Sequence, residues 1–104
     1  MGGNFHSFNS LSSEEFERGI HIKSLAIENA QARHLEFEPG SVIPDHRHPV
    51  KVVTVILEGD IVMTVRMEPQ RFTKGDVFIV PTNTSPNAHI LDKRAIAVSW
   101  SGNP

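Results

Sequence analysis

One stretch of the chain decides the fold, and it reads Glu38-Pro39-Gly40-Ser41-Val42-Ile43-Pro44-Asp45-His46-Arg47-His48-Pro49. A proline-glycine turn leads to two histidines that stand two positions apart. On an extended strand this spacing puts both imidazoles on the same face, where they can converge on one point. Imidazole is a common ligand for first-row metals, yet two histidines fall short of the three or four protein ligands that usually hold an ion. The pair alone is therefore compatible with a metal site, with exposed histidines or with histidines satisfied in a core.

Short strand candidates separated by turn signals surround this stretch. They are rich in Val, Ile, Thr and Phe, as strands packed in a sandwich or barrel should be. The candidates are Ile20 to Glu28, Ala32 to Phe37, Val50 to Leu57, Ile61 to Val65, Asp76 to Val80 and Ala95 to Trp100. The pattern predicts an all-β domain, a sandwich or a barrel, over residues 20–104, preceded by an N-terminal segment over residues 1–19.

The connections between these candidates carry their own signals. Gly59, between Glu58 and Asp60, fits a tight hairpin because glycine accepts the positive φ that such a turn demands. Glu68-Pro69-Gln70 is typical of a turn. In the N-terminal segment, Ser12-Ser13-Glu14-Glu15 has the spacing of a capping box, which predicts a short helical turn around Ser13 to Arg18.

Composition narrows the partners. With 104 residues the chain can enclose one hydrophobic core, and 38% apolar and 21% charged residues are typical of a folded domain. The net charge of −2 and the absence of a basic run argue against nucleic acid. The longest apolar run is too short to span a bilayer, so we expect no membrane partner. The chain has no cysteine, which agrees with a reducing, cytoplasmic compartment and leaves His, Asp, Glu or Gln to hold any metal.

The chain resembles the cupins, in particular the small single-domain cupins of the pectin-degradation type. The first cupin motif is matched by residues 38–49 followed by Val55-Ile56-Leu57-Glu58-Gly59-Asp60, and the second by Gly75-Asp76-Val77-Phe78-Ile79-Val80-Pro81-Thr82-Asn83. The resemblance covers about residues 18–101. It implies a double-stranded β-barrel of the jelly-roll type, often dimeric, in which a metal is held by two histidines, a Glu or Gln and a last histidine.

Two of these ligand positions depart from the family pattern. His46 and His48 match, but Val52 stands where the Glu or Gln is expected and Pro86 where the last histidine is expected. Neither Val nor Pro can ligate through its side chain. Because three or more positioned ligands are what offset dehydration of an ion, we expect a divalent metal (Zn, Ni, Fe or Mn) to be weakly bound or absent.

His89 is the one candidate for a replacement ligand. It lies three residues after Pro86, and on a regular strand a shift of three reverses the face, so that it would point away from the cavity. In an irregular loop it could instead turn inward and form a three-histidine face with His46 and His48. Both arrangements are open at this stage.

Three functions follow from this interpretation. The first is a protein that binds a small organic molecule in a cavity lined by His46, His48, Val52 and Pro86. The second is a metal-dependent isomerase or oxygenase, acting on a sugar acid or similar organic acid, that uses His46, His48 and His89. The third is a metal-free enzyme in which His46 or His48 moves a proton.

Two further expectations concern the surface of the barrel. We expect a homodimer, because such barrels often protect an edge strand by pairing it with a partner, and the N-terminal segment is a candidate for this. We expect His34 to face solvent or a second subunit, and Trp100 to pack in the core or at an interface.

Overall fold

The computed structural model describes residues 6–44, 50–65, 67–84 and 87–102, and it is built almost entirely of strands. One short 3-10 turn, η1, lies at Phe8–Ser10. The strands are β1 Glu14–Glu17, β2 Ile20–Ile27, β3 Ala30–Phe37, β4 Val42–Ile43, β5 Val52–Glu58, β6 Asp60–Val65, β7 Glu68–Thr73, β8 Val77–Val80, β9 Asn87–Ile90 and β10 Ala95–Gly102. The all-β prediction is confirmed.

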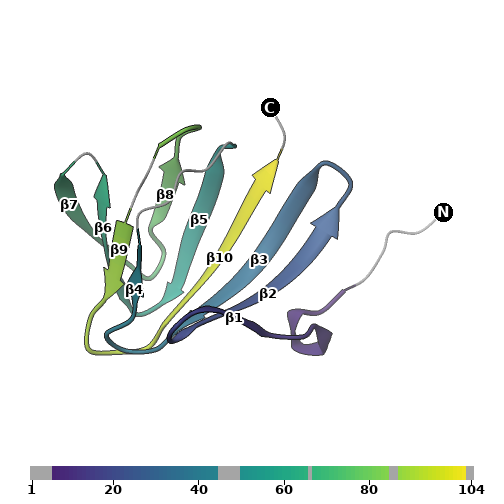
Figure 1. The fold of residues 1–104 in the computed structure, drawn as a ribbon, viewed down its shortest axis with the longest axis horizontal. Helices are drawn as coiled ribbons and strands as arrows, with labels where there is room; N and C mark the ends of the chain where they lie inside the picture. The colour runs from purple at the N-terminus through teal and green to yellow at the C-terminus, as the bar shows by residue number, and fades with distance from the viewer. Residues whose placement is uncertain (1–5, 45–49, 66, 85–86, 103–104) are drawn as a thin grey trace.

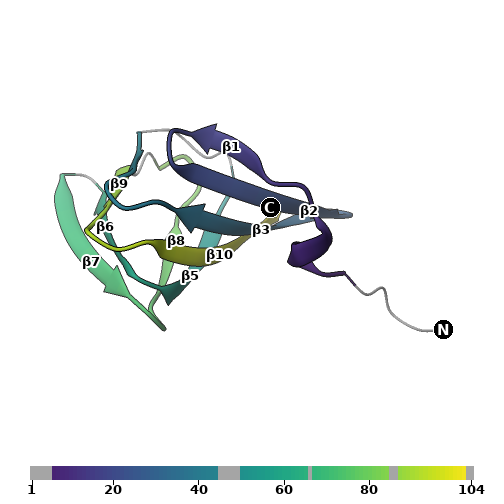
Figure 2. The ribbon, with the colours of Figure 1, turned by 90° about the horizontal axis from the view of Figure 1, so that it is seen from below.

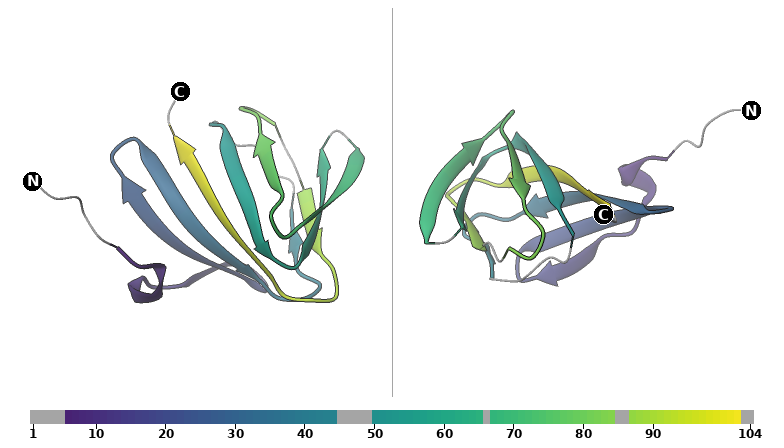
Figure 3. Two further views of the ribbon diagram at one scale, coloured as in Figure 1. Left: turned by 180° about the vertical axis from the view of Figure 1, so that it is seen from behind. Right: turned by 90° about the horizontal axis from the view of Figure 1, so that it is seen from above.

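The strands form two antiparallel sheets. One has six strands in the order β1-β2-β3-β10-β5-β8, and the other has four in the order β4-β9-β6-β7. Figure 1 shows β2, β3, β10 and β5 side by side, with the four-stranded sheet beyond β5 and β8. Viewed from below, the two sheets curl toward each other into a barrel, and the N-terminal turn lies outside it (Figure 2). Figure 3 shows the same arrangement from behind and from above.

The core lies between the two sheets, because side chains alternate across each strand and the inward set is apolar. The six-stranded sheet contributes Ile20, Phe37, Val52, Ile56, Val80, Ala95 and Ala97, and the four-stranded sheet contributes Ile61, Met63, Ala88 and Ile90. Ile56 and Ala97 are fully buried, and they face each other across β5 and β10. This alternation fixes which residues can face a cavity.

The hairpin at Gly59 has the conformation that the sequence predicts. Gly59 is the single residue between β5 and β6, and its φ is +82°. A Cβ atom at this position would lie 2.5 Å from the backbone oxygen of Arg94. The glycine is therefore required both by the turn and by the close approach of the next chain segment.

Two local predictions differ from the structure. The helical turn lies at Phe8–Ser10 rather than around Ser13 to Arg18, because Glu14–Glu17 forms β1 and pairs with β2, which outweighs a capping-box pattern. The turn predicted at Glu68-Pro69-Gln70 is instead part of β7. Pro69 is accommodated because β7 is an edge strand, where a missing N–H costs no ladder bond on the open side.

Candidate functional site

A cavity of about 370 Å³ lies between the two sheets. Most of its wall is apolar, with side chains from both sheets: Ile20, Ile22, Leu35, Phe37, Ile43, Val52, Ile61, Met63, Phe78 and Val80. Phe72 and Phe78 pack together, with ring centroids 4.8 Å apart, and stiffen one side of it. A largely apolar pocket of this size, with a few polar groups, is typical of a site for a small organic molecule.

Four polar residues of the wall form one row across the inner face of the six-stranded sheet, while Glu14, Gln31 and Asn87 line the wall outside this row. Ser24, Arg33, Ser99 and Thr54 are register partners on β2, β3, β10 and β5, so their side chains leave the same face. All four line the cavity. The row therefore crosses an apolar pocket with one guanidinium and three hydroxyls.

Two of these hydroxyls belong to buried residues. Thr54 is 6% exposed and Ser99 is 4% exposed. Neither hydroxyl takes part in a side-chain hydrogen bond among the described residues. Among the described residues, every side-chain oxygen or nitrogen that is closed off from solvent has a hydrogen-bond partner. Because these two hydroxyls have no such partner, they are not closed off, and they open into the cavity that their residues line. They are available to a ligand.

Arg33 is held in place inside the wall. Its Nη2 donates a hydrogen bond to Oε1 of Gln31, the next inward-facing residue on β3. None of the ion pairs among the described residues involves Arg33. Glu14, the other ionisable residue among those that line the cavity, is exposed and forms no ion pair with it. The guanidinium therefore keeps its charge free for a bound molecule.

The structure places the predicted cavity residues as follows. Val52 is buried and lines the cavity. His46, His48 and Pro86 lie outside the described residues, so their part in the cavity stays a prediction. The wall that is described contains no imidazole, and Val52 offers no donor at the expected ligand position. Val52 therefore does not supply the Glu or Gln ligand that the resemblance implies.

His89 lies in the middle of β9, between the buried residues Ala88 and Ile90. Its own side chain is exposed and is absent from the described cavity wall. This is the orientation of a regular strand, in which neighbouring side chains point to opposite faces. The inward turn of His89 is therefore not observed.

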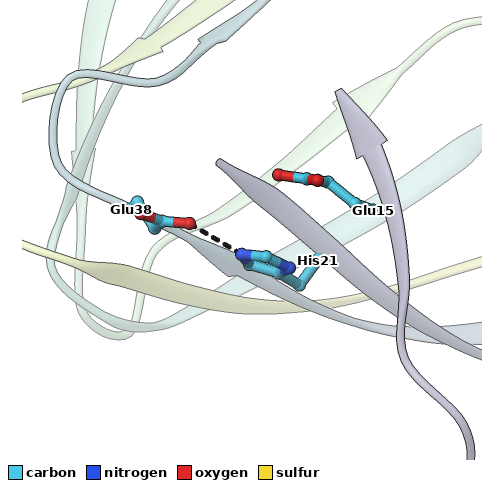
Figure 4. A group of neighbouring side chains, drawn as sticks. All are labelled: Glu15, His21 and Glu38. Carbon is cyan, nitrogen blue, oxygen red and sulfur yellow. Dashed lines mark hydrogen bonds and ion pairs between the residues drawn. The ribbon is translucent and has the colours of Figure 1, made fainter. Parts of the chain in front are cut away.

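A second group of ligating side chains lies outside the barrel, on β1, β2 and the end of β3. Glu15, His21 and Glu38 each offer one donor atom, and these atoms lie within 4.8 Å of one another. Figure 4 shows the Glu38 carboxylate directed at the His21 ring, with Glu15 beside it. An imidazole and two carboxylates are ligands that a divalent ion accepts. Of the described residues, this group is the one that could hold a metal.

Hydrogen bonding already organises this group. Nε2 of His21 and Oε2 of Glu38 are 2.8 Å apart, and the N–H of Gly19 donates to Oε2 of Glu15 over 3.1 Å. The hydrogen bond that the protonated His21 ring donates to the Glu38 carboxylate raises the pKa of the imidazole above its usual value. Glu15 and His21 are register partners, which brings the two side chains together across the β1–β2 hairpin.

The outer face of the six-stranded sheet is also distinctive. Leu25, Ala32, Trp100, Val53 and Ile79 form one cross-strand row on it. Val98, Val55 and Val77 form the apolar part of the next row, which His34 and Lys23 continue. Trp100 is 47% exposed and Ile79 is 57% exposed. Trp100 therefore does not pack in the core of its own chain, and the interface alternative remains a prediction.

The sequence analysis missed Arg33, Ser99 and Thr54. The signal was available for Arg33, because it alternates with Leu35 and Phe37 and must share their inward face. The same alternation places Thr54 with Val52 and Ile56, and Ser99 with Ala97, but it does not show whether a hydroxyl meets a cavity or a closed core. Glu15 and Glu38 were missed because the turns that bring them to His21 depend on the hairpin pairing.

Comparisons with known proteins agree with this fold. A family model described as "Cupin domain" matches residues 33–94. No curated protein matches the chain significantly. In the part of the chain that the structure describes, no helix is long and apolar enough to cross a membrane.

Several solved structures have the same fold. KdgF from Halomonas sp. superposes with a TM-score of 0.86 at 23% identity, covering 99% of this chain and 96% of that protein. An RmlC-like cupin from Shewanella frigidimarina gives 0.87 at 20% identity, covering 99% and 93%. The cupin domain of Cnp3 from Schizosaccharomyces pombe gives 0.83 at 22% identity, covering 96% and 69%. At these identities the likeness concerns the fold.

Proposed function

This chain belongs to the cupin domain family, and we propose that it binds a small organic molecule in the cavity between its two sheets. One observation carries the proposal: a cavity of about 370 Å³ has a largely apolar wall crossed by the row of polar side chains on the six-stranded sheet. Apolar walls supply affinity by removing apolar surface from water, and a few fixed polar groups supply orientation. Such a cavity suits sensing or storage as well as catalysis.

A matched pair of variants on β10 tests this proposal. Ser99 faces the cavity, while its neighbour Val98 faces the outer side of the same sheet. Binding of small acids, alcohols and sugars is followed by ligand-observed NMR, first with the wild-type chain. We expect Ser99→Leu to weaken every hit about tenfold or more by filling the cavity, and Val98→Leu to leave the hits unchanged. Equal effects of the two variants, in chains that stay folded, would refute a cavity site.

The metal-dependent alternative has less support among the described residues. It needs a third ligand beside His46 and His48, and His89 is exposed on the far side of β9. A bound Zn²⁺, Ni²⁺, Fe²⁺ or Mn²⁺ would act there as a Lewis acid. The described cavity wall supplies a guanidinium and hydroxyls, which orient a substrate but do not replace a missing metal ligand. We therefore place binding of an organic molecule first.

We also propose that the outer face of the six-stranded sheet is covered by a second copy of the chain. Its rows around Trp100 and Ile79 form a contiguous apolar surface. An exposed apolar surface of this kind usually marks a site of interaction with another molecule. At its edge Arg94 is already paired with Glu36 and Glu58 within the chain. An apolar face with internally balanced charges fits an equal face better than a charged partner, which favours a symmetric dimer.

A further inference from the structure

We infer that the cavity selects a small monocarboxylate with an apolar body, and that Arg33 binds its carboxylate with the Ser99 and Thr54 hydroxyls. This inference rests on the proposed function, since it names the class of molecule that the same cavity takes. The molecule inferred here differs from the sugar acid that the family resemblance implies. Both carry a carboxylate, but the body of this molecule is apolar rather than hydroxylated.

The first step concerns the charged end of the molecule. Arg33 lies in the cavity wall, without an ion pair among the described residues, between the register partners Ser24 and Ser99. Its Nη2 is engaged with Gln31, which fixes the guanidinium and leaves its other N–H groups free to donate. A planar guanidinium matches the two oxygens of a carboxylate. Arg33 therefore forms the anion-binding end of the cavity.

The second step concerns the neighbouring hydroxyls. Ser99 is a register partner of both Arg33 and Thr54, so the three side chains follow one another across β3, β10 and β5. Both hydroxyl residues are more than nine-tenths buried, and their oxygens make no hydrogen bond among the described residues. Since both hydroxyls open into the cavity, each can donate a hydrogen bond to a bound acceptor. A carboxylate oxygen is such an acceptor.

The third step concerns charge and the rest of the molecule. Arg33 is the one cationic residue among those described in the wall, and one positive charge balances a monoanion better than a phosphate dianion. Beyond the polar row the wall also contains Glu14, Gln31 and Asn87, but most of it is made of Ile, Leu, Phe, Val and Met side chains. These offer no partners to the several hydroxyls of a sugar, whose burial would then be costly. An aliphatic or aromatic body fits this wall.

Matched acids and amides test the inference. Hydrocinnamate is compared with hydrocinnamamide, and hexanoate with hexanamide, by isothermal titration calorimetry at neutral pH. We expect each acid to bind at least about tenfold more tightly than its amide, because hydrogen bonds to charged groups are the stronger ones. Arg33→Gln is expected to abolish this preference. The control Arg71→Gln removes the same charge from the four-stranded sheet, where Arg71 pairs with Asp60, and should keep the preference.

The outcomes separate the inference from the function on which it rests. If acids and amides bind equally, or if Arg33→Gln keeps the preference for acids, the inference is overturned while the cavity function stands. If neither acid nor amide binds at millimolar concentration, the inference is overturned, and the cavity function is then decided by the comparison of Ser99→Leu with Val98→Leu. If Arg33→Gln fails to fold, Arg33→Lys replaces it. A smaller preference of this variant for the acid over its amide supports the inference, and an unchanged affinity for the acid overturns it.

Discussion

Each face of the six-stranded sheet carries one row of side chains that an ordinary half-exposed sheet would not have there. The inner face, where apolar side chains are expected throughout, has the polar row Arg33, Ser99 and Thr54. The outer face, where polar side chains are expected, has the apolar row around Trp100 and Ile79. Both departures lie on the same strands, one residue apart. The contrast supports the two proposals made above, a small molecule bound inside and a second copy of the chain outside.

The greatest change is expected in the free energy of unfolding when an isoleucine is truncated on the inner face rather than on the outer face. Ile56 is fully buried on the inner face of β5, while Ile79 is exposed on the outer face of β8. Ile56→Ala should lower the free energy of unfolding by about 2–5 kcal/mol, because it removes buried methyl groups and leaves a cavity. Ile79→Ala should change it by less than about 1 kcal/mol.

Urea unfolding at low protein concentration measures both variants, so that association on the outer face does not contribute. Equal losses for the two variants would show that the outer face is also core, and the contrast between the faces would disappear.

The second prediction concerns association. Trp100→Arg places a charge in the apolar outer face, and we expect it to weaken the homodimer at least about 100-fold because a buried unpaired charge is costly. Met67→Arg is the matched control, since Met67 is 93% exposed and lies on the other sheet, beside β7. Sedimentation equilibrium measures both. A wild-type chain that is monomeric at all concentrations would overturn the proposal that a second copy of the chain covers the outer face.

The third prediction concerns metal at the two histidine groups. Because His89 is exposed on the outer side of β9, His89→Ala should leave the metal content and the Zn²⁺-induced rise in melting temperature unchanged. His21→Ala should reduce the rise caused by excess Zn²⁺, since His21 lies with Glu15 and Glu38. Protein purified without a histidine tag is used. Near-stoichiometric metal that disappears in His89→Ala would instead support the metal-dependent enzyme.

The smallest expected effect is the pH dependence of the pair between His21 and Glu38. The hydrogen bond to Glu38 raises the pKa of His21 in the folded chain above the ordinary value of 6.5. The pair therefore stabilises the fold fully below that ordinary value, and its contribution is lost as the pH rises through the raised pKa. We expect Glu38→Gln to lower the pKa of His21, followed by NMR titration of the ring. An unchanged titration would mean that the pair does not form in solution.

The sequence predicted the barrel well because its strands and turns are local. The alternation from Leu35 to Phe37 and the glycine at position 59 each specify one strand or one turn without help from distant residues. Strands β4 and β9 escaped prediction because they are short and pair only with each other and with β6. β1 carries a helical capping pattern that pairing with β2 overrides.

The site was less predictable than the fold. The two histidines that drew attention in the sequence, His46 and His48, lie outside the described residues, and His89 follows the regular alternation of β9. The polar row becomes visible only when the register joins Arg33, Ser99 and Thr54 from three strands that are far apart in the chain. Register of this kind is set by the whole sheet rather than by any local pattern.

One measurement tests the central claim, that the inner face binds a small molecule and the outer face does not. Methyl NMR spectra are recorded while hydrocinnamate is added to the wild-type chain. We predict shifts for the cavity methyl groups of Ile22, Leu35 and Ile61, and none for those of Val53, Val98 and Ile79 on the outer face. Shifts confined to the outer face would contradict the account.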